Sequence, residues 1–65
     1  MKLYLRKIRL NSGGYDSLQI YWGVGAPLYE YFDEDSDTHG HVRASTRDAA
    51  KHHIRAYFPN VEFYR

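Results

Sequence analysis

The chain contains no cysteine, and this absence excludes two ways in which small domains are stabilised. Without cysteine, neither disulfides nor thiolate-bound metal sites can form. A domain of this size buries only about 60% of the surface that its unfolded chain exposes. Stability must therefore come from the core itself, to which the 17% aromatic content contributes large side chains. We expect a single domain over residues 1–65, in a reducing cytoplasm.

Long apolar runs and a strong charge of one sign are also missing. The longest apolar run is only a few residues, and Arg6 and Lys7 interrupt the first apolar stretch, so we expect neither a membrane span nor a signal peptide. The formal net charge is +1, but basic residues gather in positions 2–9 and acidic residues in positions 30–37. This pattern predicts one basic and one acidic region, and it fits neither an acidic DNA mimic nor a histone-like binder.

The first half of the chain predicts strands separated by turns. Residues 2–10 read as a strand in which Leu3 and Leu5 lie on one face and Ile8 on the other. The change of phase indicates a bulge near Arg6 and Lys7, or a strand covered on both faces. Residues 11–14 are typical of a turn, and apolar alternation predicts a short second strand over residues 18–22.

Residues 28–33 form the clearest central strand. Leu28 alternates with Tyr29 and Tyr31, so we expect Leu28 in the core and the two tyrosines on the opposite face of the sheet. The polar run 33–38 is typical of a hairpin connection, and residues 39–44 return as a strand.

A helix is predicted after Ser45 or Thr46, either of which can cap the first backbone N–H groups. It ends near residue 57 or 58, before Pro59. Four residues form the face expected to lie on the sheet: Ala50, Ile54, Tyr57 and Phe58. Three basic residues recur at every fourth position on another face: Arg47, Lys51 and Arg55.

Residues 61–64 read as a final strand with Val61 and Phe63 directed inward. Because strand–helix–strand connections are right-handed, this strand should run parallel to the strand before the helix. The predicted order is strand, possible short strand, strand, strand, helix, strand. The fold class is α+β, with a small antiparallel or mixed sheet of three to five strands and one helix of the C-terminal half packed on one face.

Catalysis has little support in this sequence, and we predict that the protein is not an enzyme. The serines and threonines lie in turns and caps, and paired carboxylates would have to come from the acidic hairpin. The glycines of Gly23-x-Gly25 open no helix, and no Lys-Ser/Thr follows them, so no phosphate loop and no cofactor are expected.

The histidines raise the question of a metal site. His39 and His41 share a face of their strand, and Asp35 or Asp37 lies near enough in sequence to join them. Adjacent His52 and His53 diverge on the helix, so only one of the two can take part. Exposed positions that tolerate histidine are the simpler interpretation, and no metal is predicted. The aspartates of the hairpin lack the glycine and the closing carboxylate of a calcium loop.

Protein recognition fits the composition best. Seven tyrosines and one tryptophan exceed what a core of this size can bury, and exposed rings anchor interfaces. The predicted interaction surface combines four rings with the basic helix face: Tyr21, Trp22, Tyr29, Tyr31, Arg47, Lys51 and Arg55. Tyrosines that merely close the edge of the core are an equally supported alternative. Homodimerisation could use the same surface.

Nucleic-acid binding is the alternative function. Arg6, Lys7 and Arg9, together with the basic helix face, could contact phosphates while exposed tyrosines stack on bases. The competing interpretation is a solvated helix face and charges that protect a strand edge from aggregation.

Four segments resemble small proteins encoded by tailed bacteriophages and prophages. They are Gly14-Tyr15-Asp16, Tyr21-Trp22-Gly23-x-Gly25-x-Pro27-Leu28-Tyr29-x-Tyr31, Val42-Arg43-Ala44-x-x-Arg47-x-x-Ala50-Lys51 and Phe58-Pro59-x-x-x-Phe63-Tyr64. The resemblance implies a phage accessory protein that binds and redirects host or phage proteins in the host cytoplasm. It implies no catalytic residue and no ligand.

Overall fold

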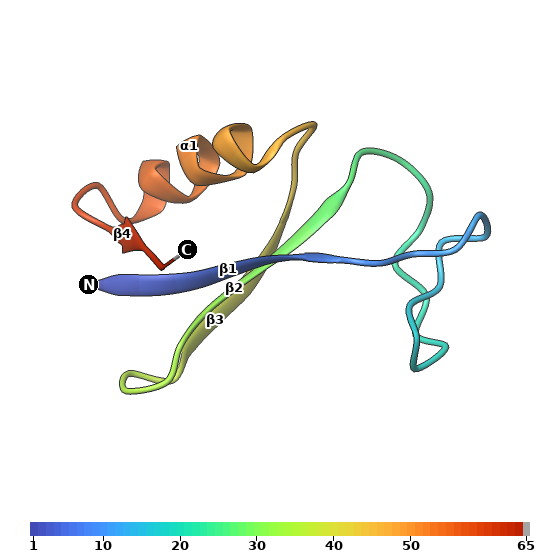
Figure 1. Ribbon diagram of the computed structural model, residues 1–65, viewed down its shortest axis with the longest axis horizontal. Helices are drawn as coiled ribbons and strands as arrows, with labels where there is room; N and C mark the ends of the chain where they lie inside the picture. Colours follow the sequence, from blue (N-terminus) through green and yellow to red (C-terminus); the bar gives the residue numbers. More distant parts are fainter. Residues whose placement is uncertain (65) are drawn as a thin grey trace.

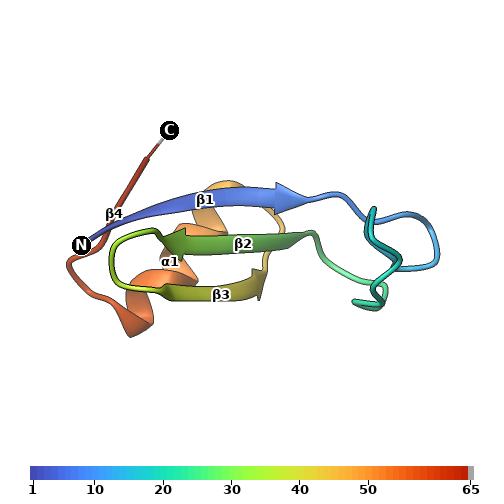
Figure 2. The same cartoon turned by 90° about the horizontal axis from the view of Figure 1, so that it is seen from below.

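The computed structural model describes residues 1–64, which form a four-stranded sheet and one helix (Figure 1). The elements are β1 (Lys2–Ile8), β2 (Leu28–Asp33), β3 (Thr38–Arg43), α1 (Arg47–Tyr57) and β4 (Glu62–Phe63). The strands lie in the order β3-β2-β1-β4, antiparallel except for β4, which pairs in parallel with β1 (Figure 2). The predicted α+β class is confirmed, and so is the common direction of β3 and β4.

The cap of α1 explains where the helix begins. Thr46 has an extended backbone, and its Oγ1 accepts a hydrogen bond from the Ala49 N–H at 3.1 Å. Ala50 and Ile54 are buried against the sheet, as predicted. Tyr57 is 78% exposed, so its predicted place in the core is wrong. The chain leaves the helix at this point, and the residues after Tyr57 pack against the core instead, namely Phe58 and Val61.

The register of β1 on β2 is unbroken, which excludes the predicted bulge at Arg6 and Lys7. Pairing runs without interruption from Tyr4 opposite Phe32 to Ile8 opposite Leu28. The apolar residues change from one face of the strand to the other because β1 contributes apolar side chains to both faces of the sheet. Leu3 and Leu5 are buried beneath the helix, whereas the half-buried Ile8 lies on the other face.

The two faces of β2 are the reverse of those expected. Tyr29 is buried in the core under α1, and Tyr31 packs against that core, edge-on to Phe58 with ring centroids 6.2 Å apart. Leu28 lies on the opposite face, buried outside that core cluster. Tyr31 fits under the helix because its partner across the β2–β3 pair is Gly40, which leaves room for the ring.

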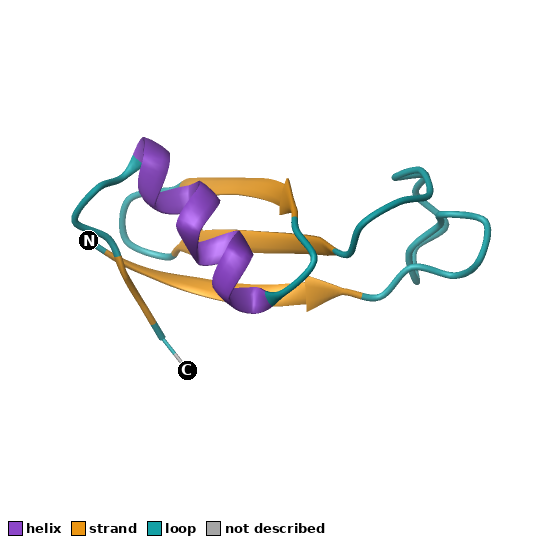
Figure 3. Ribbon diagram, turned by 90° about the horizontal axis from the view of Figure 1, so that it is seen from above, coloured by secondary structure: helices purple, strands orange, loops and turns teal. Residues whose placement is uncertain are grey.

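No strand forms over residues 18–22. Gln19 has a φ of 65°, a left-handed conformation that interrupts an extended chain, and only an isolated bridge joins Tyr15 to Tyr21. Residues 9–27 instead make a folded loop that extends beyond the sheet at the end away from β4 and is not covered by the helix (Figure 3). We call residues 9–27 the projecting loop.

Candidate functional site: the projecting loop

Two side chains of the projecting loop fold it by accepting backbone hydrogen bonds. Asn11 Oδ1 accepts from the N–H groups of Gly13 at 2.9 Å and Tyr15 at 3.1 Å. Asp16 Oδ1 accepts from Leu18 at 2.8 Å and Ile20 at 3.0 Å. These contacts are the mechanism by which asparagine and aspartate stabilise turns, and they define two consecutive bends.

Asp16 also holds the tryptophan. Its second oxygen, Oδ2, accepts a hydrogen bond from Trp22 Nε1 at 2.8 Å. The Trp22 hydrogen bond, followed by that from the Ile20 backbone, holds the pKa of Asp16 below its usual range. The Trp22 ring lies against the His41 ring of β3, with centroids 4.5 Å apart. One carboxylate thus links the outer bend to the indole that rests on the sheet.

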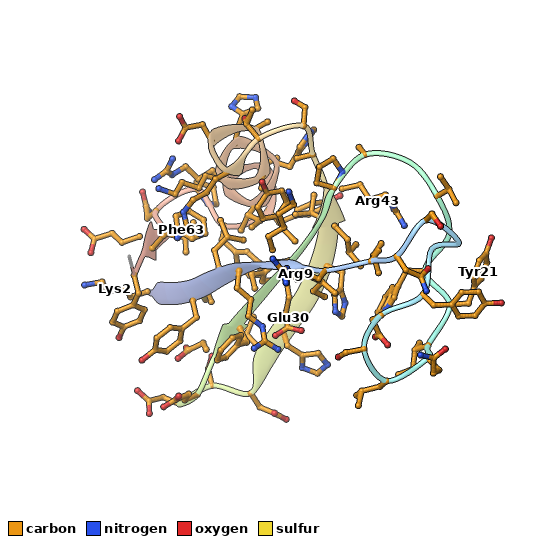
Figure 4. All side chains as sticks on the ribbon, turned by 45° about the vertical axis from the view of Figure 1, so that its right-hand side comes forward. Lys2, Arg9, Tyr21, Glu30, Arg43 and Phe63 are labelled. Carbon is orange, nitrogen blue, oxygen red and sulfur yellow. The ribbon has the colours of Figure 1, made fainter. Side chains whose placement is uncertain are left out.

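Arg43, at the end of β3, fastens the returning chain of the loop to the sheet. Its guanidinium donates to the carbonyl oxygens of Ala26 at 2.7 Å, Trp22 at 2.6 Å and Gly23 at 3.0 Å. Figure 4 shows this side chain directed from β3 toward the loop. A planar guanidinium presents several donors in a fixed arrangement, so a single residue can orient three carbonyl groups.

Two glycines allow the incoming and returning chains of the loop to cross closely. The Trp22 N–H donates to the Gly14 carbonyl at 2.8 Å. Gly14 has a φ of 84°, and a β-carbon there would lie 2.6 Å from the carbonyl carbon and oxygen of Gly23. Only glycine tolerates both the conformation and this contact.

The folded loop exposes several large apolar side chains. Leu18 and Val24 are each 77% exposed, and Tyr21 is 63% exposed. Tyr15 and Ile20 are also exposed, and the rings of Tyr15 and Tyr21 lie 5.1 Å apart. We call these five residues the apolar tip: Tyr15, Leu18, Ile20, Tyr21 and Val24. Exposed apolar side chains on a hydrogen-bonded loop are typical of a binding surface.

Only part of the predicted ring cluster belongs to this surface. Tyr21 lies on it and points away from the sheet (Figure 4), whereas the half-buried Trp22 lies against His41 of β3. Tyr29 and Tyr31 are wrong as anchors, because both lie on the sheet face that α1 covers. Because Tyr29 and Tyr31 are alternate residues of β2, they share a face, and the β1–β2 register puts that face on the side of Leu5.

The predicted basic helix face does not join the rings. Arg47 donates to the carbonyl oxygens of Leu5 at 2.7 Å and Tyr64 at 3.0 Å, and so serves to hold α1 to the two neighbouring strands. Lys51 and Arg55 lie over the ring of Phe63, at 5.7 and 5.2 Å from its centroid. Phe63 and Tyr21 mark opposite ends of the molecule (Figure 4).

Four residues of the apolar tip are absent from the predicted interaction surface: Tyr15, Leu18, Ile20 and Val24. The spacing of Leu18 and Ile20 resembles a half-buried strand, which concealed their exposure. The signal that could have found them is the pair of polar turn residues, Asn11 and Asp16, whose side chains can replace a strand partner for the backbone.

The sheet face opposite the helix carries a second aromatic group. Tyr4 stacks between Tyr64 and Phe32, with centroids 4.3 and 5.0 Å away, and Lys2 lies over the Tyr64 ring. The negative charge of Glu34, with partial burial, raises the pKa of Tyr4. Because the rings stack on one another, their faces are largely used within the chain.

His39 and His41 do share this face, but no three metal-ligating side chains cluster anywhere in residues 1–64. Glu30 instead lies 3.1 Å from Arg6 and 3.7 Å from His41.

Within residues 1–64, no helix is long and apolar enough to cross a bilayer.

Comparisons with protein-family models, with curated proteins and with solved structures find no match to this chain. The geometry of the loop and the chemistry of its side chains therefore carry the functional inference.

Proposed function

We propose that this chain is a small non-enzymatic accessory protein that binds another protein through the apolar tip of its projecting loop. The observation that carries the proposal is the combination of exposure and order. Leu18, Tyr21 and Val24 are largely exposed, yet hydrogen bonds that Asp16 accepts and Arg43 donates hold the backbone of the loop that bears them. A surface that is ordered before binding loses less conformational entropy when the partner arrives.

The size of the tip suits a compact interface. Full burial of one aliphatic or aromatic side chain contributes about 1.5–3 kcal/mol, and a few such anchors dominate most interfaces. Tyr15 and Tyr21 add rings whose hydroxyl groups can remain in water at the rim of a contact.

The resemblance to proteins of tailed phages supports a more specific role. An accessory protein of this type would act in the cytoplasm of a host cell, on a host protein or on another phage protein. The loop segment Tyr21-Trp22-Gly23-x-Gly25 is part of that resemblance, and it is also the segment that Arg43 fastens. The resemblance and the geometry therefore point to the same region of the chain.

The alternative of nucleic-acid binding is less well supported. Arg47 is engaged with two carbonyl groups and Arg6 with Glu30, so two of the cations expected to contact phosphates already have partners. Lys51 and Arg55 lie against Phe63, at the other end of the molecule from the loop. Nuclease treatment separates the two functions experimentally.

The test is affinity capture from host-cell lysate, with and without nuclease, followed by mass spectrometry. A Leu18→Ser/Val24→Ser double variant removes the two most exposed aliphatic side chains of the tip. The matched control is Tyr57→Ser, which removes a side chain of similar exposure from the end of α1. Because all these side chains are exposed, the free energy of unfolding of each variant should lie within about 0.5 kcal/mol of the wild-type value.

We expect one protein to be retained by wild type and by the Tyr57 control, to survive nuclease, and to be lost from the loop variant. Retention that is equal in the loop variant and the control would refute the apolar tip as the binding surface. Retention that disappears with nuclease would favour the alternative function.

A further inference from the structure

The two sides of the sheet end differently. On the β1 side, β4 pairs with the first residues of the strand, and two outward carbonyl groups accept hydrogen bonds: that of Leu3 from the Tyr64 N–H at 2.9 Å, and that of Leu5 from Arg47 at 2.7 Å. On the other side, β3 is the last strand, and no strand lies beyond it in the part of the chain that the structure describes (Figure 2). The six residues of β3 therefore form an open edge.

The backbone of β3 presents three residues to that edge. The Ala44 N–H donates to the Pro27 carbonyl at 3.0 Å, so the backbone groups of residue 44 point toward β2. Backbone groups alternate in direction along an antiparallel strand, and those of His39, His41 and Arg43 therefore point away from β2. These groups form no hydrogen bond within residues 1–64. A row of free N–H and C=O groups is a template for a further strand.

The helix side of the same edge is apolar and has room for a side chain. Gly40 has no side chain, and a β-carbon there would meet the Tyr31 hydroxyl and ring. The half-buried Tyr31 ring thus extends from β2 across β3, edge-on to Phe58. α1 crosses the sheet diagonally, and its C-terminal end reaches the β3 edge (Figure 3). A strand added to β3 would therefore lie against Tyr31 and the end of the helix.

We propose that the β3 edge pairs with β3 of a second copy of this chain, antiparallel and with the two-fold axis at His41. The three outward residues lie symmetrically about His41. In this register His41 pairs with the partner's His41 and His39 pairs with the partner's Arg43, so every free N–H and C=O group gains a hydrogen bond. Between these pairs, Val42 of each chain lies opposite Gly40 of the other. The branched side chain fills the space beside the glycine and contacts Tyr31.

The side chains of β3 favour a second copy over other strands. The edge lacks the residues that usually prevent pairing, since β3 contains no proline and no lysine and Arg43 is turned toward the projecting loop. No pair of fixed like charges meets, because histidine is neutral at pH 7. A strand of an unrelated protein would gain the same backbone bonds, but not Val42 against Gly40 in both directions. The sheet would continue through the pair, with the two projecting loops at opposite ends.

The first experiment measures the mass of the full-length chain by light scattering as its concentration rises to millimolar. We expect wild type to become dimeric. His41→Pro should remain monomeric, because proline removes an outward N–H group and places its ring at the edge, while the bonds to β2 are kept. The matched control, His41→Ala, keeps the N–H group and should dimerise as wild type does. Circular dichroism checks that both variants are folded.

Cysteine cross-linking then tests the register, and the natural chain has no cysteine to interfere. In a His41→Cys dimer the two substituted Cα atoms would lie about 5.5 Å apart, within the range of a disulfide. We expect a covalent dimer under mild oxidation. The matched control is His39→Cys, on the same exposed face of β3. Its two substituted residues would lie four positions apart along the paired strands, or about 14 Å, and should stay unlinked.

Three results would overturn the β3 pairing: a monomer at millimolar concentration, dimerisation of a folded His41→Pro variant, or equal cross-linking at positions 39 and 41. If His41→Pro does not fold, the two cysteine variants decide.

The pairing is separable from the proposed function, because the apolar tip lies beyond the end of the sheet. The Leu18→Ser/Val24→Ser variant should lose capture from lysate and still dimerise. If it keeps both, the β3 pairing stands and the proposed function falls. If it loses the dimer, the chain associates through the apolar tip and the β3 pairing is refuted.

Discussion

Individual residues of the projecting loop act mainly on its backbone. Gly14 lies where the incoming chain passes the returning chain at Gly23, and Asp16 and Arg43 together engage six N–H and carbonyl groups. The exposed side chains of the apolar tip do not hold the loop backbone in a comparable way. The residues that shape the loop and those that would bind a partner are therefore largely different, so each set can be changed separately.

The Gly14→Ala substitution tests the crossing. Its β-carbon would lie 2.6 Å from the Gly23 carbonyl group, at a left-handed φ of 84°. We expect a loss of about 1–3 kcal/mol in the free energy of unfolding, or local opening of the loop, because strain and overpacking both oppose the native conformation. Urea unfolding followed by Trp22 fluorescence measures the effect.

Gly13→Ala is the matched control, since Gly13 has no left-handed φ and an added β-carbon there would have contacts no closer than 3.4 Å. Its effect should remain small. If alanine at Gly14 is tolerated as well as alanine at Gly13, the close crossing does not determine the loop conformation.

At the scale of elements, α1 is attached to the sheet by two kinds of contact. Ala50 and Ile54 are buried on the face formed by Leu3 and Tyr29. Arg47, one turn before Ala50, bridges β1 and the end of β4 through two carbonyl groups. β4 pairs with β1 only at Lys2 and Leu3. The two Arg47 hydrogen bonds therefore extend the contact between β1 and the end of β4 beyond the paired residues.

Replacing Arg47 with alanine should therefore weaken the docking of β4 as well as of α1. Hydrogen bonds from a charged donor contribute about 1.5–3 kcal/mol, less where solvent can replace them, so we expect a loss of about 1–2 kcal/mol. Arg55→Ala, at an exposed position, should change stability by less than about 0.5 kcal/mol. Equal effects of the two substitutions in chemical denaturation would contradict this structural role of Arg47.

The molecule as a whole has two parts that are held together differently. The buried apolar side chains come from the strands, from α1 and from two residues just outside them, Ala44 and Val61. None comes from residues 9–27, which are held by polar contacts. The sheet and helix should therefore respond to loss of apolar burial, and the loop to loss of hydrogen bonds or charge.

Acid should release the loop before it unfolds the rest of the chain. The pKa of Asp16 is lowered in the folded state, so its contribution is complete above the ordinary aspartate pKa of about 3.9 and is lost as the pH falls through the lower folded value. We expect the Trp22 signal to change in this range while the helical circular dichroism of α1 is retained.

Asp16→Asn is the control, because its amide does not titrate. Its single oxygen can accept the bonds of Leu18 and Ile20 but not that of Trp22 as well, so its Trp22 signal is compared across pH and not with the wild-type signal. Its Trp22 signal should not change over the same range. A single midpoint for Trp22 and for the helix in the wild-type protein would show that the loop is not an independent unit. Asp33, whose pKa is lowered chiefly by the Ser36 hydroxyl, lies in the hairpin and should not affect the Trp22 signal.

The candidate site was predictable only in part. Composition predicts a recognition surface that includes Tyr21 and Trp22, and the structure places Tyr21 on the apolar tip. Leu18 and Ile20 were missed because their alternation is the same in a strand and in a bent loop.

The sequence by itself determined the fold class, the approximate bounds of α1 and the positions of β2 and β3, because periodicity, capping and turn propensities are local properties. It left the cap open between Ser45 and Thr46, and the structure shows Thr46. It also showed that Tyr29 and Tyr31 share one face of their strand. Only the tertiary structure decided which face the helix covers, because either choice satisfies the alternation until the β1–β2 register is set. It likewise decided the place of the projecting loop, since the contacts from Arg43 to that loop join positions far apart in the chain.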